Sequence, residues 1–579
     1  MRFGSFSTWL LLACLPTMLM AQESITQYAD SNRTPTYFEV IDFYRQVSSS
    51  PYAQLDSAGT TDAGYPLHTL ILDRRQQFEP NVIRTAGRSI LLINNAIHPG
   101  EPDGVDACIR LVQQWVNAPE LLPENTVIVI IPMYNIGGAL NRNSHSRANQ
   151  NGPESYGFRG NARNYDLNRD FIKQDTENAR TFARIFHHWQ PDVFIDTHVS
   201  NGADYQHVMT LVPTQHDKLS PPLGDYLVET VLPSLYRGME AAGFPMSPYV
   251  DPIGATPDAG IVGFLDHPRY STGYAALFNT IGFMTETHML KPYPQRVKAT
   301  EAFIEQTLAM MATETTNLKH VRAEAEKYNR QAAALPLNWK PDLACRDSVY
   351  FRGYTARYKP SEVSGAERLY YDRSAPWERN IPLYDHYDPD DHVQVPPVYI
   401  LPGAWKSVAT MLERNGIVYT VAGKTDTLLA EVYYIDDYQT SERAYEGHYI
   451  HYATLTRTEQ EMVVVQPGDI IIRTNQPGRR FIAEVLEPTA PDSYFSWNYF
   501  DPILMQKEWF SSYVFEDVAA ELLREDVALR TAFETKKQQD PAFANNAFDQ
   551  LYFIYRHSPY YEPTHLRYPV ARIWEAVAE

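Results

Sequence analysis

His98 and Glu101 form a short pair of potential metal ligands in the segment SILLINNAIHPGEPDGVDACIRL, residues 89–111. Imidazole nitrogens and carboxylate oxygens are ligands from which proteins build catalytic zinc sites, and such sites keep one position open for water. A His-x-x-Glu pair arises about once by chance in a chain of this composition. The alternative is a polar turn after a buried strand, so the pair needs partners from elsewhere in the chain.

His198 is a third candidate ligand, because it ends a run of apolar residues in DVFIDTHVSNGAD. As a single residue, it would more commonly be a hydrogen-bonded histidine of the core. Glu286 ends another apolar run, in GFMTETHM, and His98 follows a third. Functional sites of open α/β sheets form where the strands end at their carboxyl ends. We therefore expect these side chains to meet at one edge of a sheet.

The elements that must position these residues alternate between strands and helices from about residue 35 to residue 315. Short apolar runs rich in β-branched residues indicate strands that are covered on both faces; these runs are SILLINNAIH, TVIVIIPMYN, DVFIDTHVS, QHVMTLVP and GFMTETHM. Helices are predicted between them, at 103–117, 175–189, 223–242 and 297–315. This alternation predicts an α/β fold with a mixed, largely parallel sheet flanked by helices.

The sequence changes in character after about residue 320. A charged helical connector, HVRAEAEKYNRQAAA, leads into tyrosine-rich segments that are interrupted by proline. EVYYIDDYQ, YEGHYIHYATLTRTEQEMVVVQPGDIIIRT and RRFIAEVLEP predict β-strands and turns, and helices are predicted near 515–537. We expect a catalytic domain over 22–325, followed by a β-rich accessory region with C-terminal helices over 326–579.

The segment GFRGNARNYDLNRDF, residues 157–171, together with HPGE and DTH, resembles the zinc carboxypeptidases of the carboxypeptidase A type. Those enzymes carry His-x-x-Glu, then Asp-x-Asn-Arg, then a third histidine after a strand, and then a late catalytic glutamate. All four elements occur here in that order, over about residues 85–290. The combination is far more specific than any one of its members.

The resemblance implies one zinc ion per catalytic domain, with His98, Glu101 and His198 as its ligands. Asp166 corresponds to an aspartate that orients a ligand histidine through the second ring nitrogen, which fixes the tautomer of the ring. Glu286 corresponds to the general base that activates water and passes the proton to the leaving amine.

Asn168 and Arg169 correspond to the pair that binds the terminal carboxylate of the substrate, for which a planar guanidinium is well suited. An arginine that polarises the scissile carbonyl is also implied; Arg159 has the spacing of one branch of the family, and Arg163 and Arg147 are alternatives. A tyrosine that covers the substrate is a further family feature, with Tyr274 as the candidate and Tyr270 as the alternative. The ordinary alternative for each arginine is a surface ion pair worth about 0–1 kcal/mol.

Composition and charge restrict the partners of the protein. The formal net charge of −20 argues against nucleic acid and predicts weak attraction to anionic membranes. Residues 1–21 read as a secretory signal peptide, with lipoprotein processing at Cys14 as the less favoured alternative. No other stretch is apolar for long enough to span a membrane. We therefore expect a secreted or periplasmic protein.

These observations predict an exported zinc metallopeptidase that releases C-terminal residues from peptides with a free carboxylate. One alternative is an amidase, or a carboxypeptidase that trims muropeptides, on the same scaffold. Another is a non-catalytic binding protein with a degenerate peptidase domain. Intact metal ligands and an intact general base argue against the last alternative.

Overall fold

The computed structural model describes residues 24–575. The signal peptide predicted over residues 1–21, together with Cys14, lies outside the described residues. Within residues 24–575, no helix combines the length and the apolar character that a membrane crossing requires.

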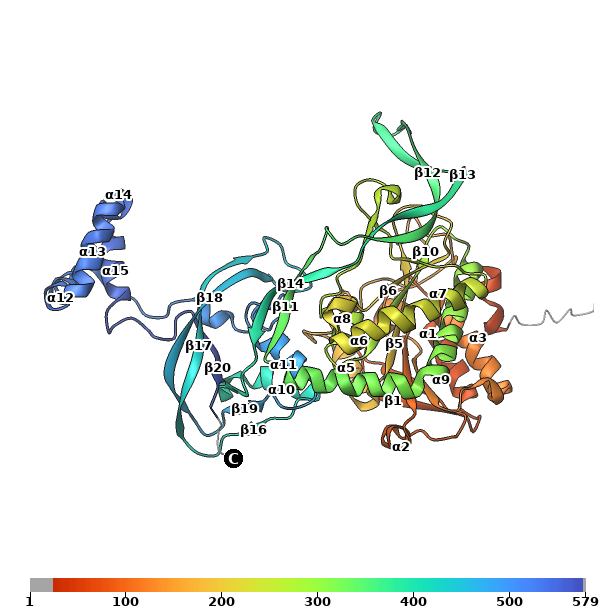
Figure 1. Ribbon diagram of the computed structural model, residues 1–579, viewed down its shortest axis with the longest axis horizontal. Helices are drawn as coiled ribbons and strands as arrows, with labels where there is room; N and C mark the ends of the chain where they lie inside the picture. Colours follow the sequence, from red (N-terminus) through yellow and green to blue (C-terminus); the bar gives the residue numbers. More distant parts are fainter. Residues whose placement is uncertain (1–23, 576–579) are drawn as a thin grey trace, which may run out of the picture.

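A mixed sheet of eight strands forms the centre of the N-terminal part (Figure 1). In spatial order its strands are β1 (Ala53–Thr60), β2 (Pro66–Leu72), β4 (Thr126–Ile131), β3 (Ser89–Asn94), β5 (Val193–Ser200), β10 (Ile281–His288), β6 (Met209–Pro213) and β7 (Ser247–Pro248). The four central strands β4, β3, β5 and β10 are parallel to one another. β2 pairs antiparallel with β4, and β6 pairs antiparallel with β10. The predicted α/β class with a largely parallel sheet is confirmed.

Strand β3 shows why the central strands are apolar throughout, since all six of its residues are buried. Leu91 and Ile93 face one core, whereas Ile90 and Leu92 face the other. Successive side chains of a strand point to opposite faces, so a sheet covered on both faces needs apolar residues at every position. The first face is covered by α1 (Tyr37–Val47), α3 (Asp103–Asn117), α6 (Pro221–Tyr226), α7 (Leu232–Ala241) and α9 (Tyr293–Gln331), and the second by α5 (Glu177–Trp189) and α8 (Ser271–Ala276).

Helix α9 connects the two parts of the chain. The helix predicted at 297–315 and the charged connector after it are one continuous helix from Tyr293 to Gln331. The domain boundary predicted after residue 325 therefore falls inside the C-terminal end of this helix.

The C-terminal part is rich in β-strands, as predicted. Its main sheet has six strands, in the order β16 (Thr420–Val421), β19 (Ile470–Arg473), β15 (Val398–Leu401), β20 (Arg567–Ile573), β17 (Asp426–Thr440) and β18 (His451–Val465). A hairpin of β12 (Asp347–Pro360) and β13 (Glu367–Tyr384) extends away from the body (Figure 1). Because β13 pairs with β9 (Ile261–Val262), strands from both parts of the chain belong to one sheet.

The segment RRFIAEVLEP is a helix, and the strand predicted there is wrong. Its residues form α11 (Arg479–Leu486), which follows Gly478 in a left-handed conformation with φ 80°. Every residue from Arg480 to Leu486 is buried. A short segment that is buried on all sides carries no period that distinguishes a strand from a helix.

The core on the second face of the sheet continues into the C-terminal part. Phe186 and Phe194 of the N-terminal part belong to the same buried cluster as Tyr399, Phe481 and Trp497. The rings of Phe278 and Phe481 stack with their centroids 5.3 Å apart. The C-terminal part therefore covers apolar surface that the N-terminal part would otherwise expose to water.

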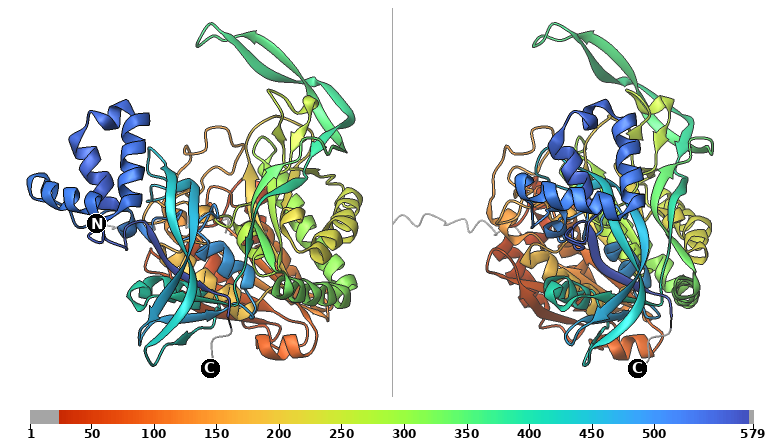
Figure 2. Two further views of the ribbon diagram at one scale, coloured as in Figure 1. Left: turned by 60° about the vertical axis from the view of Figure 1, so that its left-hand side comes forward. Right: turned by 90° about the vertical axis from the view of Figure 1, so that its left-hand side faces the viewer.

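Four helices near the C-terminus form a separate unit with a small core of its own, and they lie to one side of the body (Figure 1 and the left view of Figure 2). They are α12 (Ser512–Glu525), α13 (Val527–Gln539), α14 (Pro541–Ala544) and α15 (Ala547–Arg556). The chain then returns to β20, and the N–H of Leu566 donates to the carbonyl of Ile503 at 2.9 Å. The helical unit is thus inserted between two neighbouring points of the chain.

Candidate metal centre and substrate pocket

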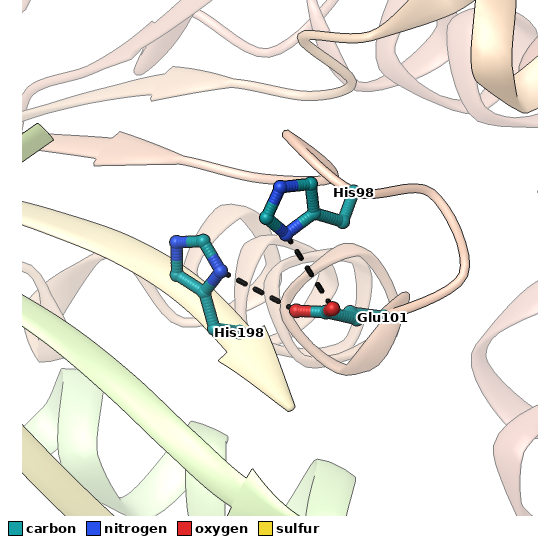
Figure 3. Close-up of side chains that lie close together, drawn as sticks. All are labelled: His98, Glu101 and His198. Carbon is teal, nitrogen blue, oxygen red and sulfur yellow. Dashed lines mark ion pairs between the residues drawn. The ribbon is translucent and has the colours of Figure 1, made fainter. Parts of the chain in front are cut away.

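His98, Glu101 and His198 meet in one place, where one ligand atom of each lies within 4.8 Å of the other two (Figure 3). The Nδ1 atom of His98 lies 3.4 Å from Glu101 Oε1, and the Nδ1 atom of His198 lies 3.3 Å from Glu101 Oε2. All three side chains are almost fully buried. Both rings therefore present the same nitrogen to the same carboxylate.

The parallel sheet brings these residues together. His98 and Glu101 lie in the turn that joins β3 to α3, and the N–H of Glu101 closes this turn on the carbonyl of His98 at 2.8 Å. His198 lies in β5, which pairs parallel with β3. The arrangement at the carboxyl ends of neighbouring parallel strands is the one that the sequence predicted.

Each histidine has its second nitrogen fixed by an aspartate. Nε2 of His98 hydrogen-bonds Asp166 Oδ1 at 2.9 Å, and Nε2 of His198 hydrogen-bonds Asp196 Oδ2 at 2.9 Å. When Nε2–H donates, the lone pair of Nδ1 is free for a cation, and metal-ligating histidines are usually held in this way. Sequence reasoning proposed Asp166 and missed Asp196, although a residue two positions before His198 in a strand lies on the same face.

The chemistry of the donor set fits zinc. The Nδ1 atom of His98 is a buried polar atom that has no hydrogen-bond partner among the described residues. Two imidazoles and one carboxylate are a ligand set of catalytic zinc sites. Burial tends to raise the pKa of Glu101, but the charges of Arg147 and His98 outweigh this effect and hold the pKa well below its ordinary value. The carboxylate is thus ionised and ready to bind a cation.

Glu286 lies beside this group, on β10. Its register partner in the neighbouring strand β5 is His198. Burial raises the pKa of Glu286 to about 7; the nearby Glu101 adds to the rise, whereas His198 opposes it. The carboxyl group lines the same pocket as the three candidate ligands.

The pocket has a volume of about 460 Å³. The candidate ligands and Glu286 share its wall with residues predicted to bind substrate and with further aromatic and polar residues. Its other lining residues include Arg147, Arg159, Asn168, Arg169, Tyr249, Phe264, Tyr270 and Met284. Of these, Tyr249 and Phe264 carried no recognisable signal in the sequence.

Asn168 and Arg169 enter the pocket from a short turn after Asp166. The Oδ1 atom of Asn168 accepts the N–H of Ser271 at 3.1 Å, and its Nδ2 contacts Met284 Sδ at 3.8 Å. The guanidinium of Arg169 lies over the ring of Tyr270, 4.5 Å from the centroid. Stacking on an aromatic ring leaves the edge of a guanidinium free to bind a carboxylate.

Two arginines contact the acidic groups of the centre. Arg159 donates from Nε to Asp166 Oδ2 at 2.9 Å, and its Nη1 lies 3.5 Å from Glu101 Oε1. Arg147 donates from Nη1 to Glu101 Oε1 at 2.8 Å. Both line the pocket, whereas Arg163 instead lies 3.5 Å from Asp62 and donates to the carbonyl of Asp175.

Tyr274 does not lie in the pocket, and the structure corrects this expectation. Its side chain is buried in the core behind the sheet, where the hydroxyl donates to Asn415 Oδ1 at 2.6 Å and hydrogen-bonds His187 Nε2 at 2.9 Å. Tyr274 lies inside the short helix α8, which turns its ring toward α5. Tyr270, at the N-cap of that helix, lines the pocket instead.

Comparisons with known proteins relate part of this chain to one family. The family model described as zinc carboxypeptidase matches residues 41–198. A metallo-carboxypeptidase of Burkholderia cenocepacia is 16% identical, with a TM-score of 0.35, over 48% of this chain and 69% of its own. A metallo-carboxypeptidase of Pseudomonas aeruginosa is 16% identical, with a TM-score of 0.36, over 49% of this chain and 69% of its own.

A carboxypeptidase A of Helicoverpa armigera is 13% identical, with a TM-score of 0.36, over 51% of this chain and 75% of its own. No curated protein matches the sequence. The matched segment contains all three candidate zinc ligands, His98, Glu101 and His198. Residues 41–198 of this chain therefore match the zinc carboxypeptidase family, which is zinc-dependent.

Proposed function

We propose that the protein is an exported zinc carboxypeptidase that releases C-terminal residues from peptides with a free carboxylate. The observation that carries this proposal is the set of four groups in one pocket. His98, Glu101 and His198 converge there, with the carboxyl group of Glu286 beside them. The zinc carboxypeptidase domain supports a metallopeptidase, and the export and the specificity are part of the proposal.

His98, Glu101 and His198 would hold the zinc ion. Bound zinc supplies a Lewis acid that lowers the pKa of water and polarises a carbonyl group. Asp166 and Asp196 keep the two rings in the tautomer that presents Nδ1. The two aspartates thus contribute to metal affinity without touching the metal.

Glu286 would act as the general base. A group that takes a proton from the attacking water and returns it to the leaving amine works best when its pKa is near the working pH. Burial, which raises the pKa of Glu286 to about 7, provides this condition. Arg159, with Arg147 as the alternative, would stabilise the negative charge that develops on the carbonyl oxygen.

Arg169 would hold the carboxylate at the end of the substrate, with Asn168 beside it. The guanidinium of Arg169 is already oriented by Tyr270 and by a hydrogen bond from Nη1 to the carbonyl of Asn168 at 2.9 Å. Fixing the donor before the substrate binds reduces the entropy lost on binding. An anchor for the chain end restricts cleavage to the last peptide bond.

The proposal is tested with zinc-loaded protein and four substrate types. These are a blocked dipeptide with a free carboxylate, the same dipeptide as a C-terminal amide, an N-acyl amino acid, and purified muropeptides. Mass spectrometry identifies the products. We expect loss of the C-terminal residue from the blocked dipeptide with a free carboxylate, and little cleavage of its C-terminal amide.

The comparison also separates the alternatives. Turnover of only the N-acyl amino acid or only the muropeptides would assign the amidase or the muropeptide-trimming activity. A protein that binds zinc but cleaves none of the four, under conditions where a reference carboxypeptidase is active, would contradict the proposal. Glu286→Gln serves as the control for contaminating peptidases.

A further inference from the structure

A tight turn of the accessory region presses against the segment that carries Asp166. Residues 445–448 form this turn between β17 and β18, and Tyr445 and His448 exchange backbone hydrogen bonds of 2.7 and 3.1 Å. Glu446 and Gly447 at its tip have φ values of 48° and 84°. These are the positive values that a two-residue hairpin turn requires, although a residue with a side chain, such as Glu446, rarely adopts them.

The turn is fitted closely to its neighbour. A Cβ atom added to Gly447 would lie 2.8 Å from the hydroxyl oxygen of Tyr165. The absence of a side chain at Gly447 thus lets the turn approach the ring of Tyr165. Strained positions that persist in a folded protein are found preferentially at functional sites.

Glu446 makes the contact that matters for the site. Its Oε2 accepts the backbone N–H of Asp166 at 2.8 Å, from 280 positions further along the chain. The carboxylate of Asp166 binds His98 through Oδ1 and Arg159 through Oδ2. The position of Asp166 is therefore fixed from two sides, by its own side chain and by the accessory region.

Other contacts clamp the same segment. Nε2 of His448 hydrogen-bonds Asp175 Oδ2 at 2.9 Å. The hydroxyl of Tyr499 donates to the carbonyl of Lys173 at 2.8 Å and lies 3.0 Å from Asp175 Oδ1. These contacts dock the accessory region without touching Asp166.

The accessory region also contacts the segment that carries Tyr270. The N–H of Arg269 donates to Asp492 Oδ2 at 2.8 Å, and its guanidinium lies over the rings of Trp497 and Tyr445. The next residue, Tyr270, stacks on Arg169 in the pocket. The accessory region therefore holds both segments that supply the predicted carboxylate anchor.

We propose that the 445–448 turn of the accessory region is part of the active site, and that Glu446 is a positioning residue that fixes Asp166 and, through it, His98 and Arg159. The proposal rests on the proposed function and adds a residue that lies outside the matched zinc carboxypeptidase segment. The accessory region is then a component of the catalytic unit and is not a separate binding module.

The contact depends on geometry more than on charge. Burial raises the pKa of Glu446; the hydrogen bond from the N–H of Asp166 opposes the rise, and the negative charge of Asp166 adds to it. A backbone N–H needs an acceptor and not a charge, so the neutral oxygen of glutamine suffices. Glutamine at position 446 is therefore expected to keep the hydrogen bond from the N–H of Asp166, whereas alanine leaves this N–H without its acceptor.

The test compares Glu446→Ala, Glu446→Gln and Glu442→Ala in the full chain. Zn²⁺ affinity of the metal-free protein is measured by competition with a chelator, and kcat and KM are measured on the best substrate. We expect Glu446→Ala to lose about 10-fold or more in zinc affinity and a similar factor in kcat, the range found for residues that orient metal ligands. Glu446→Gln and the exposed Glu442→Ala are expected within about 2-fold of the wild type, inside the scatter of surface substitutions.

His448→Ala separates positioning from docking. It removes a contact of the same turn that does not reach Asp166, so we expect a lower melting temperature with zinc affinity within about 2-fold. Equal zinc affinity in Glu446→Ala and the wild type would overturn the proposal. So would an equal loss in Glu446→Ala and His448→Ala, because the effect would then come from loosened docking.

A further variant and a folding control complete the test. Alanine at Gly447 is strained at φ 84° and brings its Cβ within 2.8 Å of the Tyr165 hydroxyl, so we expect Gly447→Ala to displace the turn and to weaken zinc binding as Glu446→Ala does. Circular dichroism and thermal unfolding confirm that each variant is folded. If the wild type itself cleaves no peptide, the proposed function fails, while the zinc affinities still decide the role of Glu446.

Discussion

At the residue scale, the two histidines of the centre are built alike but are supported differently. Asp196, which holds His198, is fully buried and comes from the same strand, β5. Asp166, which holds His98, comes from a loop and is backed by Arg159 and Glu446. The His198 side is therefore fixed by the sheet, whereas the His98 side depends on contacts between distant parts of the chain.

The residues of the site differ in how far the sequence reveals them. The ligands could be predicted, because a metal site needs particular residue types at the ends of neighbouring strands. Tyr249 and Phe264 could not, since their place in the pocket depends on the path of loops that have no repeating pattern. Glu446 could not either, because its partner is a backbone N–H, which every residue except proline carries.

Replacing Glu286 tests the general base. We expect Glu286→Gln to lower kcat by about 10²–10⁴-fold, the usual contribution of a positioned base, because the amide cannot take a proton. The zinc content should remain at one ion per chain, since Glu286 is not among the candidate ligands. Metal analysis and single-turnover kinetics measure the two quantities; a variant that retains wild-type kcat would assign the proton transfer to another group.

Replacing Arg169 tests the carboxylate anchor. We expect Arg169→Ala to raise KM for a free-carboxylate dipeptide by about 10-fold or more, because a bidentate charged contact worth roughly 1.5–3 kcal/mol is lost. The matched C-terminal amide should respond little, since it has no carboxylate to lose. Arg163→Ala, an arginine of the same segment that pairs with Asp62, is the control. Equal effects on both substrates would place the carboxylate elsewhere.

At the element scale, burial decides which predictions hold. The central strands and α3 and α5 were predicted because their apolar residues recur with the period of the element or fill it entirely. Tyr274 was wrongly expected in the pocket because the sequence around a single tyrosine does not show which side of a short helix faces the pocket. Its hydroxyl contacts Asn415 of the accessory region, so its surroundings are set by tertiary structure alone.

Helix α3 carries a buried acid that links stability to pH. Asp106 accepts hydrogen bonds from Thr34 Oγ1 and Tyr293 Oη, both at 2.6 Å, and burial raises its pKa to about 7. The folded state then holds a proton that the unfolded chain has released, so this group makes stability fall as pH rises from about 4 to 7. Above about 7 both states are ionised, and the effect of this group is constant.

Asp106→Asn removes this dependence. Its side chain cannot ionise and keeps an oxygen that accepts both hydrogen bonds. We expect the melting temperature of the wild type to fall relative to Asp106→Asn between pH 5 and pH 7, and the difference to be level at higher pH. Asp42→Asn, at an exposed position of α1, is the control. A difference that does not vary with pH would show that Asp106 is ionised in the folded protein throughout.

At the scale of the whole molecule, the accessory region has two components with different relations to the peptidase domain. The β-rich body shares a core with it and reaches Asp166 through the 445–448 turn. The helical unit α12–α15 has its own core, and none of its residues lines the pocket. We therefore expect the first component to be required for the fold and for the proposed activity, and the second to be dispensable for both.

Removing the helical unit tests this division. The hydrogen bond from the N–H of Leu566 to the carbonyl of Ile503 shows that the chain leaves and re-enters the body at adjacent points. A short Gly-Ser linker in place of residues 505–564 can therefore close the chain without strain, because short flexible loops close at little entropic cost. We expect kcat/KM on a dipeptide within about 2-fold of the wild type, as for surface changes that touch no special feature.

A chain that ends at Gln331 exposes the apolar face covered by Tyr399, Phe481 and Trp497, so we expect it to aggregate on expression. Size-exclusion chromatography and dipeptide hydrolysis compare the two truncations; an active, monomeric protein ending at Gln331 would contradict both the shared core and the role of the turn.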